Sequence, residues 1–157
     1  MTSVVELLAN LRDQSLRNRV GLWLAPDRQL VQIVNEAARL GIDAQDIRQA
    51  LLHRLPLGTR FAGLSGTRLA DLLDSICEQP GYSDCVLVYN LDLLLAGLGY
   101  EDQQEIWRTL WQSFPHRQRA LLLVMPQTAV HLLPRSYDLA TWRRAGRLAG
   151  ETVSLGE

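Results

Sequence analysis

The stretch Ala120-Leu121-Leu122-Leu123-Val124-Met125, which stops at Pro126, decides the fold class of this chain. A short, continuous apolar run bounded by a proline favours a strand that is buried on both faces over a surface helix. Residues 20–24 (VGLWL) and residues 85–89 (CVLVY) have the same character. Strands of this kind are typical of a parallel sheet that helices cover.

Amphipathic patterns with helical spacing lie between and around these three runs. They predict helices over residues 4–16, 27–40 with Gly41 at the end, 43–55, 68–79 after Thr67, 101–114 and 139–148. Residues 56–66, rich in Gly and Pro, predict a loop, and residues 152–155 a last short strand. The alternation predicts one α/β domain over residues 1–157, a three-layer parallel sheet with helices on both faces.

The composition excludes several functions. The chain of 157 residues carries 16 basic and 17 acidic side chains, for a net charge of −1, which lacks the basic footprint of a general nucleic-acid binder. Every basic residue is arginine. No lysine is therefore present to form a Schiff base, act as a general base or grip a phosphate in a P-loop.

Cysteine usage and hydropathy indicate where the protein works. Cys77 and Cys85 have no metal-type spacing, and we expect two buried thiols in a reducing compartment. Charged residues interrupt the apolar positions of the first 14 residues, which excludes a signal-peptide pattern there, and no run of 18 apolar residues occurs. The expectation is a soluble cytoplasmic protein without membrane contact.

Ligands of parallel α/β proteins bind at the carboxyl ends of the strands, so the residues that follow each apolar run are the candidate site. These are residues 25–32 (APDRQLVQ), 89–95 (YNLDLLL) and 125–128 (MPQT). The first segment lies between a strand and a helix, where a phosphate-binding loop would be found. His53, His116 and His131 are too far apart in sequence to indicate a metal site.

This layout resembles the P-loop ATPase core of the AAA-like kind, and in particular the small P-loop-containing protein of bacteriophage-exclusion (BREX) defence systems. The middle segments LLHRLPLGTRF and RLADLLDSI, the segment VLVYNLDLLL and the tail PRSYDLATWRRAG are similar to that family. In the family, the first strand leads into G-x-x-x-x-G-K-[ST]. Here the same spacing holds Ala25 and Leu30 for the glycines, Val31 for the lysine and Gln32 for the magnesium-binding hydroxyl.

The resemblance therefore implies a P-loop NTPase-like fold with vestigial Walker motifs. Pro26, Asp27 and Arg28 occupy the interior of the lost phosphate loop. In the segment similar to Walker B, Tyr89 stands at the metal-anchoring aspartate and Asp92 at a later acidic position. A tyrosine does not hold magnesium as a carboxylate does, and Leu and Val offer bulk without charge. We expect a pseudo-ATPase with no catalytic residues, no metal and no cofactor.

The function expected from this reading is a non-catalytic subunit that binds or regulates a protein partner. The resemblance places it in a larger bacterial assembly, an anti-phage defence complex, and the apolar composition with four tryptophans also favours self-association. Two alternatives are an ATP/Mg switch rebuilt from Arg28, Asp92 and Thr128, and a nucleic-acid-binding accessory subunit. Candidate contacts with a partner or nucleic acid are the aromatic and basic residues Trp107, Trp111, Arg135, Trp142, Arg143, Arg144 and Arg147.

Overall fold

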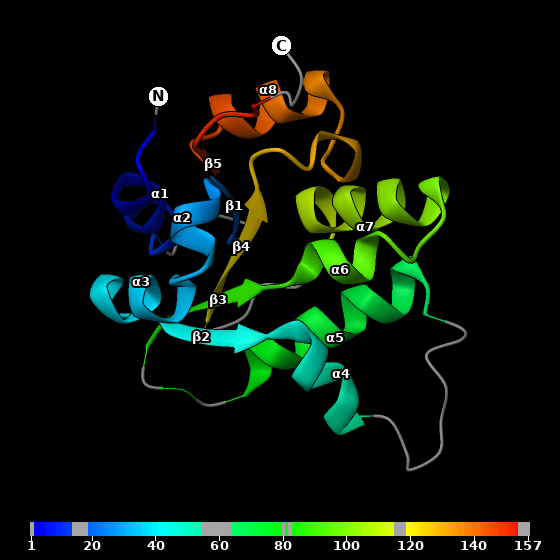
Figure 1. Ribbon diagram of the computed structural model, residues 1–157, viewed down its shortest axis with the longest axis horizontal. Helices are drawn as coiled ribbons and strands as arrows, with labels where there is room; N and C mark the ends of the chain where they lie inside the picture. The colour runs from blue at the N-terminus through cyan, green and yellow to red at the C-terminus, as the bar shows by residue number, and fades with distance from the viewer. Residues whose placement is uncertain are drawn as a thin grey trace.

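The computed structural model describes residues 2–13, 19–54, 64–79, 81, 83–114 and 119–153. Within these residues a single parallel sheet has the strand order β2-β3-β4-β1-β5 (Figure 1). The strands are β1 (Val20–Ala25), β2 (Asp43–Asp46), β3 (Cys85–Tyr89), β4 (Ala120–Pro126) and β5 (Leu148–Ala149). The α/β class and the three apolar strands predicted from the sequence are confirmed.

Short and medium helices connect the strands. They are α1 (Val4–Leu11), α2 (Asp27–Leu30), α3 (Ile33–Leu40), α4 (Ile47–Arg54), α5 (Gly66–Glu78), α6 (Leu91–Leu95), α7 (Tyr100–Gln112), the 3₁₀ turn η1 (Val130–Leu132) and α8 (Ser136–Arg144). Gly41 ends α3 with a φ of 73°, a conformation that glycine adopts without strain. Among the described residues, no helix is long and apolar enough to cross a membrane.

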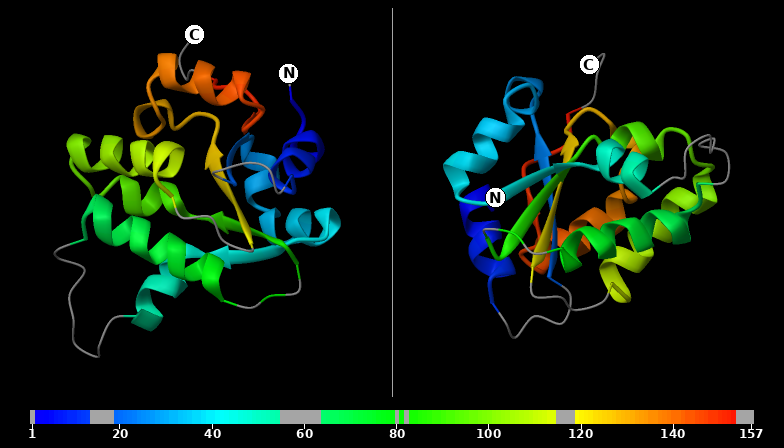
Figure 2. Two further views of the ribbon diagram at one scale, coloured as in Figure 1. Left: turned by 180° about the vertical axis from the view of Figure 1, so that it is seen from behind. Right: turned by 90° about the horizontal axis from the view of Figure 1, so that it is seen from below.

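The strand residues alternate between two core clusters. Leu22 and Leu24 of β1 belong to a large cluster with buried residues of α4, α5, α6, α7 and α8. Trp23, between them in the chain, belongs to a smaller cluster with residues of α1 and α3. In the right-hand view of Figure 2, α1 and α3 lie on the opposite side of the strands from α5 and α7. Gly21 lets α1 approach β1, because a Cβ there would lie 2.9 Å from the side chains of Leu7 and Leu11.

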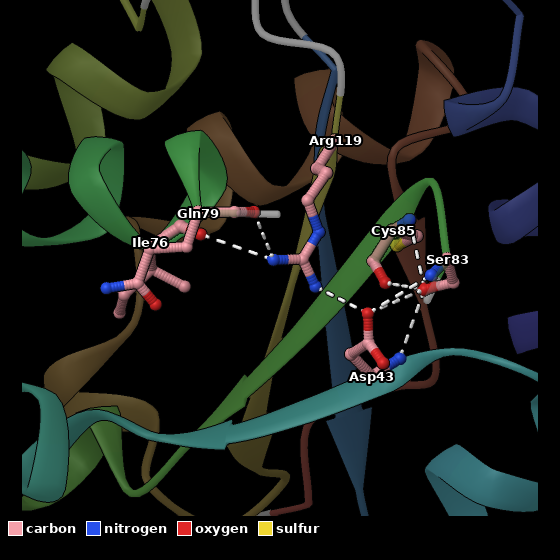
Figure 3. Close-up of polar contacts among 6 residues, drawn as sticks. All are labelled: Asp43, Ile76, Gln79, Ser83, Cys85 and Arg119. Atoms are coloured by element: carbon pink, nitrogen blue, oxygen red, sulfur yellow. Dashed lines mark hydrogen bonds and ion pairs between the residues drawn. The ribbon is translucent and has the colours of Figure 1, made fainter. Parts of the chain in front are cut away.

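The prediction of a helix that begins near residue 43 is wrong for its first four residues, which form β2 and pair with β3. Their sequence, Asp-Ala-Gln-Asp, has no strand propensity. A polar network holds this strand instead. Arg119 Nη2 donates to Asp43 Oδ2 over 2.7 Å, and the hydroxyl and backbone N–H of Ser83 donate to the same oxygen over 3.2 Å (Figure 3).

Arg119 also ties this network to helix α5. Its Nη1 atom donates to the carbonyl oxygens of Gln79 and Ile76, over 2.9 and 3.4 Å, at the carboxyl end of that helix (Figure 3). Asp43 begins β2, Ser83 precedes β3 and Arg119 precedes β4, so the network joins the amino ends of three strands. It lies at the edge of the sheet opposite to the one where parallel α/β proteins bind ligands, and its role is structural.

Three further predictions of elements are corrected. The helix expected over residues 27–40 is broken into α2 and α3 at residues 31–32, and the helix expected over 139–148 ends at Arg144. The last strand is β5, at Leu148–Ala149, whereas residues 152–153 form no strand. A two-residue strand has no periodicity to detect, and it exists only through its pairing with Leu22 and Trp23 of β1. Most of the loop predicted over residues 56–66, and residues 14–16 and 154–155, lie outside the described residues.

Candidate functional site

Among the described residues, the strand order has a switch point at the carboxyl edge of the sheet, between β1 and β4. The chain leaves β1 through α3, which packs in the smaller cluster, and it leaves β4 through α8, which packs in the larger cluster. Because β1 and β4 are neighbours, their connections diverge to opposite faces between them. Ligands of open parallel sheets bind outside the strand ends at such a switch point.

Residues of the chain itself lie against the strand ends at this switch point. The N–H of Gln127, after β4, donates to the carbonyl of Ala25 at the end of β1 over 3.1 Å. The N–H of Val153 then donates to the carbonyl of Gln127 over 2.8 Å. Gly150 packs so closely on the Leu24 carbonyl that a Cβ has no room there, and its φ of 86° suits glycine. The segment of residues 150–153 therefore lies where a ligand of the sheet would bind.

In the segment that the resemblance aligns with a phosphate loop, three backbone N–H groups already have acceptors. A phosphate loop offers free backbone N–H groups. Here the N–H groups of Gln29 and Leu30 donate to the carbonyl of Pro26, and that of Val31 donates to Asp27, so these groups are used within the turn of α2.

The side chains of residues 25–32 also lack the features of a phosphate-binding loop. Leu30 packs against the smaller core cluster, and Val31, in the lysine position, is 84% exposed. Asp27, Arg28 and Gln32 are also exposed, whereas Ala25 is buried at the strand end. The helix that follows, α2, has four residues, so its dipole is short.

A second group of polar residues lies where β2 and β3 end. Asp46 is paired in register with Tyr89, and the backbone N–H of Arg48 donates to Asp46 Oδ1 over 3.0 Å. Asp46 thereby caps the start of α4. Asn90, which follows β3, has a φ of 67°, a left-handed conformation that asparagine tolerates better than most residues.

The surroundings of this group shift the pKa values of its two carboxyl groups, Asp46 and Asp92, in opposite directions. Burial alone would raise the pKa of Asp46, but hydrogen bonds from the side chain and backbone of Arg48 and from the side chain of Asn90 lower it overall. Burial raises the pKa of Asp92, and it also raises the pKa of Tyr89, with a smaller contribution from the charge of Asp46. Asp92 follows Asn90 at the start of α6 and has no metal-type partners: among the described residues, no three His, Cys, Asp or Glu side chains could hold a metal ion.

An open hollow of about 600 Å³ lies beside this group, between α4 and α6. Asp46 and Arg48 line one part of it, and leucines line much of the rest. Leu52 and Leu93, which line it from α4 and α6, are 56% and 50% exposed. We call this the α4–α6 hollow.

A smaller hollow of about 250 Å³ lies between α7 and α8, and we call it the α7–α8 hollow. It brings together four of the seven predicted contact residues, Trp107, Trp111, Arg135 and Trp142. The other residues that line it are Gln104, Arg108, Gln112, Asp138 and Thr141. The α7 members recur at positions 104, 107, 108, 111 and 112, which is one face of a helix.

The tryptophans form the wall of this hollow and do not project from the surface. Trp107 and Trp142 are buried, at 3% and 1% exposed, and Trp111 is partly buried. The indole N–H of Trp107 donates to the carbonyl of Leu132 over 2.9 Å, and its ring meets the Trp142 ring edge to face. These rings serve the core packing that joins α7 to α8.

Arg147, another of the predicted contact residues, packs against this wall and is 6% exposed. Its guanidinium stacks on the rings of Trp111 and Trp142, 4.3 and 4.7 Å from their centroids. It donates to the carbonyl of Val20 over 2.8 Å and to the last-turn carbonyls of Leu110 and Trp111 over 3.2 and 3.4 Å. Burial lowers the pKa of Arg147 to about 10, so the group is still a cation at neutral pH.

The two remaining predicted residues, Arg143 and Arg144, are not in this hollow. Arg143 donates to the carbonyl of Gly150 over 3.4 Å and lies 4.0 Å from the carboxylate of Glu151. Arg144 is exposed and donates to the hydroxyl of Thr141 over 3.3 Å. The sequence reading missed Arg108, although its spacing from Trp107 and Trp111 places it on the same helix face.

Comparison with known proteins does not identify the chain. No protein-family model, no curated protein and no solved structure matches it.

Proposed function

We propose that this chain is a non-catalytic, P-loop-like α/β subunit that binds or regulates a protein partner within a larger bacterial assembly. The observation that carries the proposal is the closed switch point: residues 150–153 of the chain itself lie against the ends of β1 and β4. A nucleotide that bound there in the usual way would have to displace this segment.

The P-loop-like, three-layer character of the fold is part of this proposal. The all-parallel order β2-β3-β4-β1-β5 supports the α/β part of this proposal. The resemblance to the small P-loop-containing protein of BREX systems supports a place in a bacterial anti-phage defence complex. A fold of this class hosts many functions, so the site and not the fold decides between an enzyme and a binding subunit.

The residues at the site favour the binding subunit. Backbone N–H groups that a phosphate needs are used within α2, the lysine position holds an exposed valine, and Tyr89 replaces a magnesium-binding carboxylate. Exposed leucines at the α4–α6 hollow, Leu52 and Leu93, offer apolar surface of the kind found in protein interfaces.

Isothermal titration of the full chain with ATP and magnesium, and then with ADP, tests the proposal. We expect no measurable binding by a sample whose circular dichroism and thermal transition show that it is folded. Micromolar binding would overturn the pseudo-ATPase assignment and favour the alternative, a nucleotide switch. In that case an Asp92→Ala variant that abolishes ATP turnover would place Asp92 in the rebuilt site.

A second measurement addresses the partner. The proposal expects the full chain, tagged in its native host, to purify with a protein at a fixed stoichiometry through gel filtration in 0.5 M salt. A chain that always elutes as a monomer without any companion would contradict it.

A further inference from the structure

The α7–α8 hollow has an excess of positive charge. Arg108 and Arg135 line it, and neither side chain has a hydrogen-bond or ion-pair partner among the described residues. Beneath its tryptophan wall, Arg147 bonds to backbone carbonyls, which carry no full charge to offset the guanidinium. Asp138 is the single acidic residue among those that line the hollow. It lies in the first turn of α8, where the helix N-terminus already favours its charge.

We propose that the α7–α8 hollow binds an acidic segment of a partner protein, with a carboxylate side chain held by Arg108 and Arg135. Two guanidinium groups without partners at the mouth of a concave site match the geometry and charge of carboxylates. The amide groups of Gln104 and Gln112 supply further hydrogen-bond donors on the same wall. This inference rests on the proposed function, because it names the chemistry of the partner that the subunit binds.

The arrangement of the tryptophans favours a peptide over a nucleic acid. Single-stranded nucleic acids bind by stacking bases on open aromatic faces. Here Arg147 covers a face of both Trp111 and Trp142, and Trp107 is buried edge to face against Trp142. A phosphate backbone also needs a track of cations. The next arginines along the chain, Arg143 and Arg144, interact with residues of their own region instead.

Titration of the full chain with defined peptides, followed by ¹H–¹⁵N NMR, tests the inference. The probe is an acetylated and amidated octapeptide of alternating glutamate and leucine, and the same peptide with arginine for glutamate is the comparison. We expect saturable, sub-millimolar binding of the acidic peptide only. The shifted signals should lie on α7 and α8 and include the indole N–H of Trp111. The affinity should fall at least about fivefold between 50 and 500 mM salt, as expected for exposed charges.

Variants with opposite charge changes make the test specific. The double variant Arg108→Glu/Arg135→Glu should weaken binding about tenfold or more, and Asp138→Asn should strengthen it by about twofold to fivefold. Arg68→Glu, at an exposed position on α5, makes a charge change of the same sign and half the size away from the hollow, and should bind as the wild type does. All of these positions are exposed, so the variants should fold, which the NMR spectra verify.

Several results would overturn the inference. They are equal binding of the arginine peptide, wild-type affinity in the double variant, an equal loss in Arg68→Glu, shifts confined to the α4–α6 hollow, absence of saturable binding, or tighter binding of a thymidine oligonucleotide at α7 and α8. ATP titration of the same sample keeps the two proposals apart. Nucleotide binding overturns the proposed function alone, and loss of peptide binding without nucleotide binding overturns only this inference.

Discussion

Arg147 is a buried cation whose neighbours are two tryptophan rings and three backbone carbonyl groups. Its bonds connect the end of α7, the start of β1 and the start of β5, which are distant in the sequence. From the sequence it is one arginine of a basic tail and a candidate nucleic-acid contact. Its burial under Trp111 and Trp142 could not be predicted, because no local pattern distinguishes it from the exposed Arg144.

We expect Arg147→Met to lower the free energy of unfolding by about 3 kcal/mol, because the carbonyl groups of Val20 and Leu110 lose a charged donor in a buried place. Arg147→Lys should lose a similar amount, since an ammonium group cannot stack on both rings and reach all three carbonyls. Urea unfolding measures both. Arg144→Met is the matched control and should change stability by less than about 0.5 kcal/mol. Wild-type stability in Arg147→Met would refute a structural role for the cation.

Asp46 and Asp92 should change the pH dependence of the free energy of unfolding in opposite directions. The lowered pKa of Asp46 means that its carboxylate stabilises the fold above the pKa of the unfolded chain, and this contribution is lost as the pH falls through the folded-state value. The raised pKa of Asp92 means that its charge destabilises the fold at neutral pH, and protonation removes this cost as the pH falls.

We therefore expect Asp46→Asn to be less stable than the wild type at pH 7, and Asp92→Asn to be more stable. The Asp46→Asn difference should vanish below the folded-state pKa of Asp46, and the Asp92→Asn difference below the pKa of Asp92 in the unfolded chain. Urea unfolding between pH 3 and 7, with each variant compared with the wild type at the same pH, measures this. A difference that does not change over this range would show that the substitution acts through packing and not through charge.

Among the elements, the apolar ones could be predicted and the polar or very short ones could not. β1, β3 and β4 are buried on both faces, so their composition alone reveals them. β2 has two aspartates in four residues, and it is a strand because Arg119 and Ser83 hold Asp43 at the start of β3 and β4. These contacts join residues that are about 40 to 76 positions apart, which no window of sequence contains.

At the candidate site, too, some features could be predicted from the sequence and others could not. The apolar run and the proline after it correctly predict that a strand ends and a helix begins within residues 25–32. That the N–H groups of this segment are satisfied within α2, and that residues 150–153 cover the strand ends, follows only from the folded chain. The tryptophans and Arg135 are predicted as separate binding features, whereas the packing of α7 against α8 assembles them into one hollow.

At the scale of the whole molecule, Gly150 is the residue on which closure of the switch point depends. We expect Gly150→Ala to lower the free energy of unfolding by about 2–4 kcal/mol, because alanine resists a φ of 86° and its Cβ would overlap the Leu24 carbonyl. Thermal and urea unfolding measure the loss. Gly41→Ala is the control, since Gly41 also has a positive φ but has open space at its Cβ, and it should cost about 1 kcal/mol. Equal losses in the two variants would show that backbone strain alone matters and that close packing on Leu24 does not.

The sequence by itself determined the α/β class, the three central strands, the glycine that ends α3 and the lack of any lysine, because composition and local periodicity carry these properties. The tertiary structure alone decided the strands β2 and β5, the closed switch point between β1 and β4, and the charge and shape of the α7–α8 hollow. These depend on hydrogen bonds and packing between residues far apart in the chain, and each of those residues has an ordinary local sequence. A strand that is buried on both faces has an apolar sequence that reveals it. The local sequence of a residue does not reveal which distant residue it will contact.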